Sequence, residues 1–132
     1  MESIKRYLDG STILITGGTG SFGRALTERI LSISENAKIV IYSRDEYKHY
    51  LMKQDFHEAV ARNQLSFIIG DVRDRNRLIM ACRSVDFIFH AAALKQVPTC
   101  EENIEECILT NINGAVNVRF AAEMSKVKKV VA

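Results

Sequence analysis

Short apolar runs alternate with amphipathic or polar segments along this chain. The apolar runs predict strands at residues 12–16, 38–42, 65–69 and 87–90, with a fifth beginning at 129. Because these runs are apolar on both faces, they are typical of a parallel sheet that is covered on both sides. The segments between them predict helices near residues 22–33, 45–61, 74–83 and 103–125. This order predicts an α/β fold, a doubly wound parallel (Rossmann-like) sheet truncated within its fifth strand.

The bulk composition indicates one ordinary globular domain over residues 1–132. Hydrophobic residues make up 47% of the chain and charged residues 26%, which are usual globular values. The net charge of +2 is too small to indicate a nucleic-acid partner. No apolar run approaches the roughly 18 residues that span a bilayer. The first residues, M-E-S-I-K-R, carry no apolar signal-peptide core, so we expect a cytoplasmic protein without a membrane span.

The cysteines and histidines show no metal-ligand spacing. The cysteines are odd in number and form no C-x-x-C pair, so we expect reduced thiols at Cys82, Cys100 and Cys107. The histidines are scattered, and we expect His49 and His57 to lie on a polar helix. The sequence therefore predicts no metal site.

The segment T-G-G-T-G-S-F-G at residues 16–23 follows the first strand and opens a helix. A strand, glycine turn and helix in this order bind the pyrophosphate of a dinucleotide at the helix N-terminus. We expect Gly18 and Gly20 to allow the tight turn and the close approach of phosphate to the backbone. We expect Gly23 to let the helix pack closely on the strand.

The residues after the second strand predict which dinucleotide binds. An acidic residue there would hydrogen-bond the ribose 2′-hydroxyl of NAD, but this chain has Ser43 followed by Arg44. A hydroxyl and a guanidinium suit a 2′-phosphate, and Lys48 lies one helical turn further on. Asp45 and Glu46 are expected to cap the next helix. The sequence therefore predicts NADP(H), with the alternative that Arg44 only pairs with these two acids.

Polar and small residues follow the third and fourth strands. Asp71 can accept a hydrogen bond from the adenine amino group while the Val72 N–H meets a ring nitrogen. The alternative is that Asp71 caps the next helix. Lys95 is expected at the carboxyl edge of the sheet, where ligands bind, against the cofactor or an anionic substrate, with a solvated lysine as the alternative. The nicotinamide ribose and phosphates are expected to lie against three small residues, Ala91, Ala92 and Ala93.

Five segments together resemble the extended short-chain dehydrogenase/reductases, in their polysaccharide-biosynthesis branch. They are T-G-G-T-G-S-F-G, Y-S-R-D-E, G-D-V-R-D, H-A-A-A-L-K-Q-V-P and T-N-I-N-G-A-V-N-V. The chain is most similar to the first part of the inverting UDP-N-acetylglucosamine 4,6-dehydratases. The resemblance implies a tightly held NADP(H) that takes hydride from sugar C4, elimination of water across C5 and C6, return of hydride to C6, and epimerisation at C5.

The resemblance also implies roles for residues of this chain. Residues 19–22 would wrap the pyrophosphate, and residues 43–48 would hold the 2′-phosphate and the adenine end. Lys95, which would also contact substrate, and Thr110 would lie at the cofactor–substrate boundary, and Asn111 on the long helix beneath the active site. The full set of expected cofactor-binding residues is Gly17, Thr19, Gly20, Ser21, Phe22, Gly23, Ser43, Arg44, Asp45, Lys48, Asp71, Val72, Ala91, Ala92, Ala93, Lys95, Thr110 and Asn111.

The chain departs from the family where the catalytic residues are expected. The family has a Thr-Asp-Lys segment after the fifth strand and then a Tyr-x-x-x-Lys pair, and neither occurs in this sequence. We therefore assign no catalytic residue. We expect this chain to be the cofactor-binding portion of a dehydratase that acts on a UDP-sugar, and we expect the full-length protein to be a homo-oligomer. The alternatives are a nucleotide-sugar 4-epimerase or retaining dehydratase, and a non-catalytic NADP-binding module.

Overall fold

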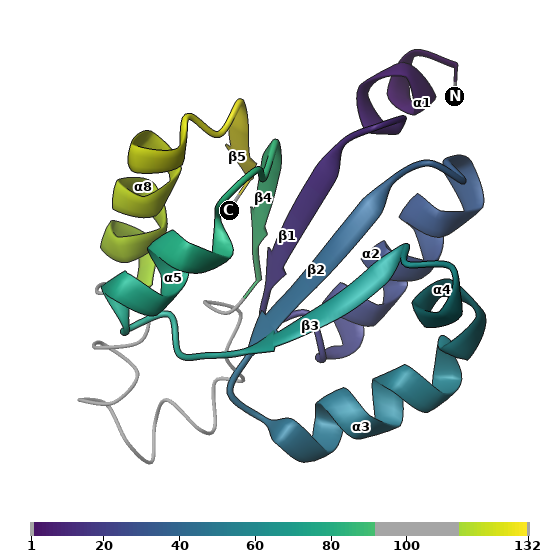
Figure 1. The fold of residues 1–132 in the computed structure, drawn as a ribbon, viewed down its shortest axis with the longest axis horizontal. Helices are drawn as coiled ribbons and strands as arrows, with labels where there is room; N and C mark the ends of the chain where they lie inside the picture. The colour runs from purple at the N-terminus through teal and green to yellow at the C-terminus, as the bar shows by residue number, and fades with distance from the viewer. Residues whose placement is uncertain (1, 92–113, 132) are drawn as a thin grey trace.

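The structure is a computed structural model that describes residues 2–91 and 114–131. Within this part of the chain, one all-parallel sheet has the strand order β3-β2-β1-β4-β5 (Figure 1). The strands are β1 Thr12–Thr16, β2 Lys38–Ser43, β3 Leu65–Ile69, β4 Phe87–His90 and β5 Lys129–Val131. The predicted doubly wound α/β fold is confirmed. The second strand runs one residue further than predicted, because Ser43 still pairs with Ile69.

Helices cover both faces of the sheet. In Figure 1, α5 and α8 lie side by side over one face, and α2, α3 and α4 cover the other. The bounds of the described helices are α1 Glu2–Leu8, α2 Ser21–Ile33, α3 Glu46–Asp55, α4 His57–Ala61, α5 Arg75–Ala81 and α8 Gly114–Ser125.

Alternate residues of the central strand face the two helical layers. Ile13 and Ile15 of β1 belong to the apolar cluster beneath α2, α3 and α4, together with Met52. Leu14 belongs to the opposite cluster, beneath α5 and α8, together with Val118. All five side chains are buried. The sheet is therefore buried on both faces, which explains why its strands are continuously apolar.

The topology brings particular residues to one edge of the sheet. From β1 the chain builds outward through β2 and β3, and then returns to add β4 and β5 on the other side. Thr16 at the end of β1 is paired in register with Tyr42 on β2 and with His90 on β4. In open parallel sheets, ligands bind beyond the carboxyl ends of the strands where the order reverses.

One helix was not predicted, one predicted helix is divided in two, and one predicted helix is described only in part. Helix α1 was not expected; it is short, and its Leu8 packs into the core while Lys5 pairs with Asp9 one turn later. The helix predicted at 45–61 is two helices, because Phe56 takes non-helical dihedral angles (φ −113°, ψ 33°) and packs against the core cluster. The helix predicted from residue 103 is described only from Gly114.

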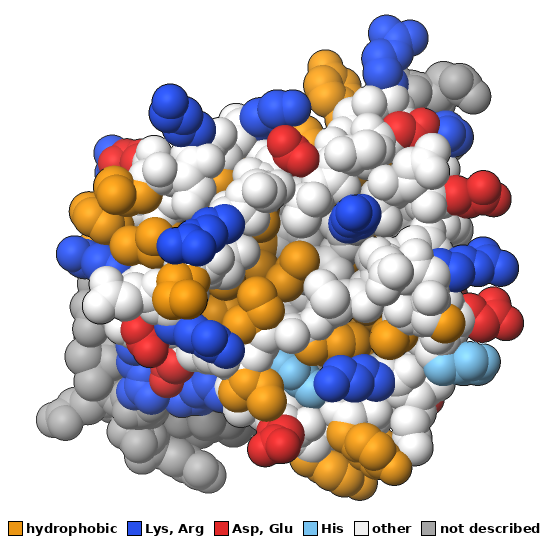
Figure 2. Space-filling model, in the orientation of Figure 1, with side chains coloured by type: hydrophobic (Ala, Val, Ile, Leu, Met, Phe, Trp, Pro, Cys, Tyr) orange, Lys and Arg blue, Asp and Glu red, His pale blue; other side chains and the backbone are white. Residues whose placement is uncertain are grey.

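The described residues also show how charges are distributed, where one cysteine lies, and whether metal-ligand groups or membrane-spanning helices occur among them. Basic and acidic side chains are interspersed over the face drawn in Figure 2. Cys82 is a free, buried thiol, whereas Cys100 and Cys107 lie outside the described residues. Among residues 2–91 and 114–131, no group of three His, Cys, Asp or Glu side chains is arranged to hold a metal ion. No helix in the same residues has the length and apolar character to cross a membrane.

Candidate dinucleotide-binding site

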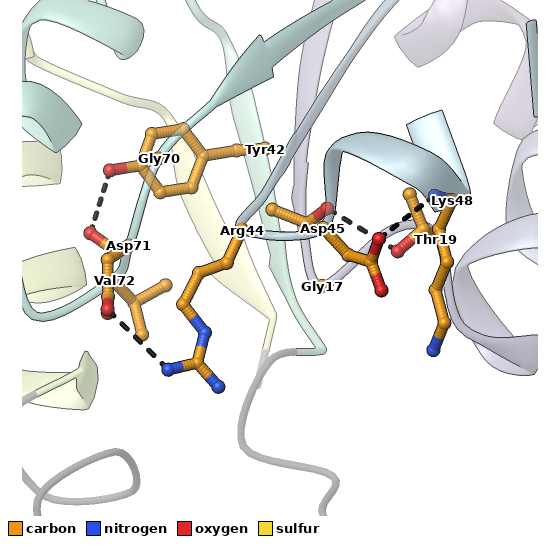
Figure 3. A pocket seen from close by; sticks show the side chains of 10 residues that line it. Gly17, Thr19, Tyr42, Arg44, Asp45, Lys48, Gly70, Asp71 and Val72 are labelled. Atoms are coloured by element: carbon orange, nitrogen blue, oxygen red, sulfur yellow. Dashed lines mark hydrogen bonds and ion pairs between the residues drawn. The ribbon is translucent and has the colours of Figure 1, made fainter. Parts of the chain in front are cut away.

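A pocket of about 220 Å³ opens at the carboxyl ends of β1, β2 and β3. Figure 3 shows it from close by, with the side chains of Arg44 and Lys48 extending toward the same open side. Residues predicted from three separate sequence segments therefore meet at one site. The pocket is lined by Gly17, Thr19, Tyr42, Ser43, Arg44, Asp45, Lys48, Gly70, Asp71 and Val72.

In the glycine-rich turn, Gly18 differs from its expected role, whereas Gly23 has the role expected of it. The tight turn depends on Gly17, whose φ of +66° is a left-handed conformation that favours glycine, and not on Gly18. A Cβ on Gly18 would lie 2.8 Å from Cδ1 of Ile41, so this residue is small because a core side chain packs against it. Gly23 has the predicted role, since its Cβ would lie 2.4 Å from the backbone of Gly18.

Helix α2 begins at Ser21 without a side-chain cap. Its N-cap residue is Gly20, and no acidic residue lies in its first turn. In contrast, Asp45 caps α3 and Asp74 caps α5, each accepting a hydrogen bond from a backbone N–H of the first turn. The N–H groups and the dipole at the start of α2 therefore favour an anion from outside the helix. Phe22 in this turn is 53% exposed rather than packed in the core.

The predicted phosphate-binding residues gather at the end of β2. The hydroxyl of Ser43 lies 2.7 Å from Nε2 of His49 and 3.4 Å from Oγ1 of Thr19. Arg44 is half-exposed and forms an ion pair with Asp71 at 3.7 Å. Lys48 is exposed, and its backbone N–H donates to Asp45 at 3.0 Å. Asp45 is therefore a helix cap, as expected, and the rim of the pocket carries hydroxyl groups and two cations.

Asp71 is held in place by an arginine and does not cap α5, because Asp74 does. The Arg73 guanidinium donates to both carboxylate oxygens of Asp71, the shorter bond measuring 2.7 Å, and the Arg73 backbone N–H donates to Oδ1. Burial would raise the pKa of Asp71, but these hydrogen bonds outweigh it and the pKa falls below its ordinary value. The Tyr42 hydroxyl donates to the Asp71 carbonyl at 2.8 Å. Asp71 is therefore an ionised acceptor, and buried Val72 follows it in the pocket wall.

Sequence reasoning did not expect Tyr42 and Gly70 in the pocket wall, or His49 directly behind it. His49 lies on α3 as expected, but it is only 2% exposed and packs against Phe67. The residues next to His49 in sequence are polar, although His49 and Met52 lie on the face of α3 that is turned to the core. A spacing of three residues between these two positions was the available signal.

His90 at the end of β4 is also buried, with Nδ1 2.7 Å from Oγ1 of Thr16. Its Nε2 has no hydrogen-bond partner among the described residues. Ala91 follows and donates its N–H to the Thr16 carbonyl at 3.0 Å, so β4 stays close to β1 at the edge of the sheet. The other expected residues of this region, namely Ala92, Ala93, Lys95, Thr110 and Asn111, lie outside the described residues.

The buried histidines make a prediction about acid stability. Burial lowers the pKa of both His49 and His90 below the ordinary value of 6.5. Below about pH 6.5 the unfolded chain binds protons that the folded chain does not, so the free energy of unfolding is expected to fall toward pH 5, by at most about 1.4 kcal/mol per pH unit for each histidine. Urea unfolding at several pH values should show that the free energy of unfolding of His90→Gln depends less steeply on pH than that of the wild type. His57→Gln, at an exposed position, is the matched control, and an unchanged slope for His90→Gln would contradict the prediction.

Known proteins share long stretches of sequence with this chain. Residues 13–132 match a family described as polysaccharide biosynthesis protein. The UDP-N-acetylglucosamine 4,6-dehydratase (inverting) of Campylobacter jejuni is 51% identical over 124 residues, which cover 94% of this chain and 36% of that protein. A UDP-glucose 4-epimerase of Rickettsia bellii is 50% identical over 123 residues, which cover 91% of this chain and 35% of that protein. The chain thus spans about a third of the length of the curated relatives it matches.

Solved structures share the fold. The X-ray structure of Pen from Bacillus thuringiensis superimposes with a TM-score of 0.85 at 36% identity, covering 94% of this chain and 37% of that one. The UDP-glucose-4-epimerase of Stenotrophomonas maltophila, solved with bound NAD, has a TM-score of 0.75 at 21% identity and covers 91% of this chain and 35% of its own. The second likeness shows the fold alone. Because the family match extends over residues 13–132, the chain belongs to the polysaccharide biosynthesis protein family, as its motifs indicated.

Proposed function

We propose that residues 1–132 are the NADP(H)-binding segment of a UDP-N-acetylglucosamine 4,6-dehydratase that serves surface-polysaccharide or glycan biosynthesis. The observation that carries the proposal is the rim of the pocket at the end of β2. There Ser43 ends the strand, and Arg44 and Lys48 follow it, in the region where a carboxylate would select NAD. The 51% identity to a dehydratase of that name supports the choice of reaction.

The residues of the pocket fit a dinucleotide with an extra phosphate. A Cβ on Gly20 would meet only the Gly17 carbonyl oxygen at 3.6 Å, so the backbone there is open to a pyrophosphate. The uncapped N-terminus of α2 would bind that group through its N–H groups. Arg44 and Lys48 would neutralise the 2′-phosphate, and Asp71 would accept from the adenine amino group. When bound, NADP supplies a reversible acceptor for the hydride of the sugar.

A direct test is calorimetry of this chain with NADP⁺ and NAD⁺. The 2′-phosphate adds charge-assisted hydrogen bonds worth about 1.5–3 kcal/mol each, so NADP⁺ is expected to bind at least 10-fold more tightly. Both titrations should be repeated at high salt, where the preference is expected to shrink because exposed charges are screened. A folded sample that binds NAD⁺ as tightly as NADP⁺ would overturn the choice of coenzyme.

The principal alternative reaction is 4-epimerisation, because the 50% identical relative from Rickettsia bellii carries the name of a 4-epimerase. Turnover of UDP-N-acetylglucosamine by the longer protein that contains this segment separates the two. A dehydratase forms a 4-keto-6-deoxy sugar, whereas an epimerase forms only the C4 epimer. We expect the dehydratase product from the longer protein. No turnover is expected from this chain alone, because its sequence has no Tyr-x-x-x-Lys pair to transfer protons. Coenzyme binding without turnover by the longer protein would favour a non-catalytic module.

The remaining parts of the proposal concern residues beyond the described site and the whole protein. Lys95 and Thr110 would meet the coenzyme where the UDP-sugar binds, and Asn111 would lie beneath them. The longer protein is proposed to be a homo-oligomer. Lys95→Ala in that protein should raise KM for the UDP-sugar, and sedimentation analysis would give its subunit number.

A further inference from the structure

Three polar side chains form a short hydrogen-bonded row at the end of β2. Oγ1 of Thr19 lies 3.4 Å from Oγ of Ser43, and Oγ of Ser43 lies 2.7 Å from Nε2 of His49. Thr19 and Ser43 line the pocket, whereas His49 lies behind them and is 2% exposed. Figure 3 labels Thr19 among the side chains that line the pocket. The buried imidazole is therefore connected to the pocket through the Ser43 hydroxyl.

The second nitrogen of this ring decides where its proton lies. His49 Nδ1 is buried and has no hydrogen-bond partner in the described part of the chain, and the ring packs on Phe67 with centroids 5.2 Å apart. A neutral imidazole has one N–H. On Nδ1 that proton would be a buried donor without an acceptor, which is rare and destabilising. On Nε2 it donates to Ser43, and Nδ1 keeps only a lone pair.

The surroundings of His49 keep the ring neutral. Burial is the largest influence and lowers the pKa of His49, and the Lys53 cation one turn along α3 lowers it further. Asp45 and Glu46 at the start of the same helix act in the opposite direction and are outweighed. From β3 the ring is faced by the apolar side chain of Phe67. Near pH 7 the ring therefore has a single proton to place.

A fixed donor on one side of a hydroxyl fixes the direction of the hydroxyl's own proton. If the Ser43 hydroxyl accepts a hydrogen bond from His49, the hydroxyl proton of Ser43 must point toward a different acceptor. The Thr19 oxygen, at 3.4 Å, is much farther than the 2.7–2.8 Å usual for such bonds, so the proton is available to an acceptor in the pocket. A phosphate dianion only accepts hydrogen bonds, whereas a ribose hydroxyl both donates and accepts.

We propose that His49 is a positioning residue for coenzyme choice: its Nε2–H donates to Ser43 and so makes the Ser43 hydroxyl a hydrogen-bond donor to a phosphate oxygen in the pocket. The inference rests on the proposed function for the identity of that phosphate. It assigns part of the preference for NADP to a buried ring that does not itself contact the coenzyme.

The test is a double-mutant cycle on coenzyme affinity near pH 7.5, where a phosphate monoester is mostly a dianion with a pKa of about 6. His49→Phe keeps a ring but removes the N–H, and is expected to weaken NADP⁺ binding about 5–10-fold with less than about 2-fold change for NAD⁺. His49→Gln restores an N–H donor and should recover most of the loss. His57→Phe, at an exposed position of α4, is the matched control.

Coupling through Ser43 gives the sharpest outcome. If His49 acts only by orienting that hydroxyl, the pair His49→Phe with Ser43→Ala should bind NADP⁺ no more weakly than Ser43→Ala alone. Additive losses would overturn the inference, as would a NADP⁺ preference that His49→Phe leaves intact while the wild type shows it. Equal binding of both coenzymes by the wild type would instead contradict the proposed function.

The tautomer can be measured without any coenzyme. Long-range ¹H–¹⁵N spectra of the wild-type chain distinguish a proton on Nε2 from one on Nδ1, with the His49→Gln spectrum providing the assignment. We expect a neutral ring protonated on Nε2. A proton on Nδ1 would overturn the inference whichever coenzyme binds, and thermal melts of each variant show whether a loss of affinity reflects a loss of folded protein.

Discussion

Gly23→Ala is expected to lower the free energy of unfolding by about 2–3 kcal/mol, the range of a severe overpacking change. Its Cβ would lie 2.4 Å from both the Cα and the carbonyl oxygen of Gly18. These are backbone atoms of the first turn, so α2 must move away from β1 or the turn must distort. Alanine is intrinsically favoured over glycine in a helix by about 1 kcal/mol, so a net loss of stability can only come from the clash. Thermal unfolding should show a melting temperature lower by roughly 10 °C.

Gly20→Ala is the matched control, and it should have the opposite pattern. Gly20 has φ −77°, which any residue can adopt, and an added Cβ would meet only the Gly17 oxygen at an ordinary contact distance of 3.6 Å. Because alanine is a poorer N-cap than glycine, the free energy of unfolding is expected to fall by at most about 1 kcal/mol, less than in Gly23→Ala. Coenzyme affinity should fall instead, because the methyl group occupies the space where the pyrophosphate approaches the backbone. Unchanged affinity in Gly20→Ala would contradict the predicted position of the pyrophosphate, and unchanged stability in Gly23→Ala would contradict the close packing.

The strands could be predicted well because their signal is local. Runs such as 12–16 and 65–69 are apolar, β-branched and bounded by polar residues, and the structure gives both the predicted bounds. The site could be predicted in outline for a related reason. In a parallel sheet the carboxyl ends of all strands share one edge, so residues that directly follow different strands must meet there. Thr19, Ser43 and Asp71 are brought to one pocket in this way.

Several contacts that organise the site could not be predicted from the sequence, some because they depend on tertiary packing. On sequence alone, Asp71 and Asp74 were both candidates to cap the next helix. The structure has Asp74 as the cap, while Asp71 accepts hydrogen bonds from Arg73. His49 looked solvated because the residues beside it are polar, yet its face of α3 is turned to the core. Phe56, which interrupts a polar helical stretch, packs against the core cluster. The environments of His49 and Phe56 depend on the residues that pack against them in the fold, which their neighbours in sequence do not show.

Arg44→Ala is expected to weaken NADP⁺ binding by about 10–30-fold and NAD⁺ binding by less than about 3-fold. Arg44 lies at the mouth of the pocket with its side chain 47% exposed, and its ion pair with Asp71 at 3.7 Å is longer than a hydrogen bond. Such an exposed pair contributes about 0–1 kcal/mol. Moving the Arg44 guanidinium from Asp71 to a phosphate therefore loses little ion-pair energy, provided that Asp71 keeps another partner.

That partner is Arg73, whose guanidinium donates to Oδ1 and to Oδ2 of Asp71. Because the carboxylate stays neutralised when Arg44 turns to a ligand, Asp71 repels a nearby phosphate less than an unpaired acid would. Arg44→Lys, which keeps the charge but loses the two-pronged hydrogen bonding, should give an intermediate loss. Arg62→Ala, at an exposed position that does not line the pocket, should bind both coenzymes as the wild type does. Calorimetric titrations of the four proteins decide the matter: equal losses for NADP⁺ and NAD⁺ in Arg44→Ala would mean that Arg44 holds a part common to both coenzymes, and coenzyme choice would then rest on Ser43 and Lys48.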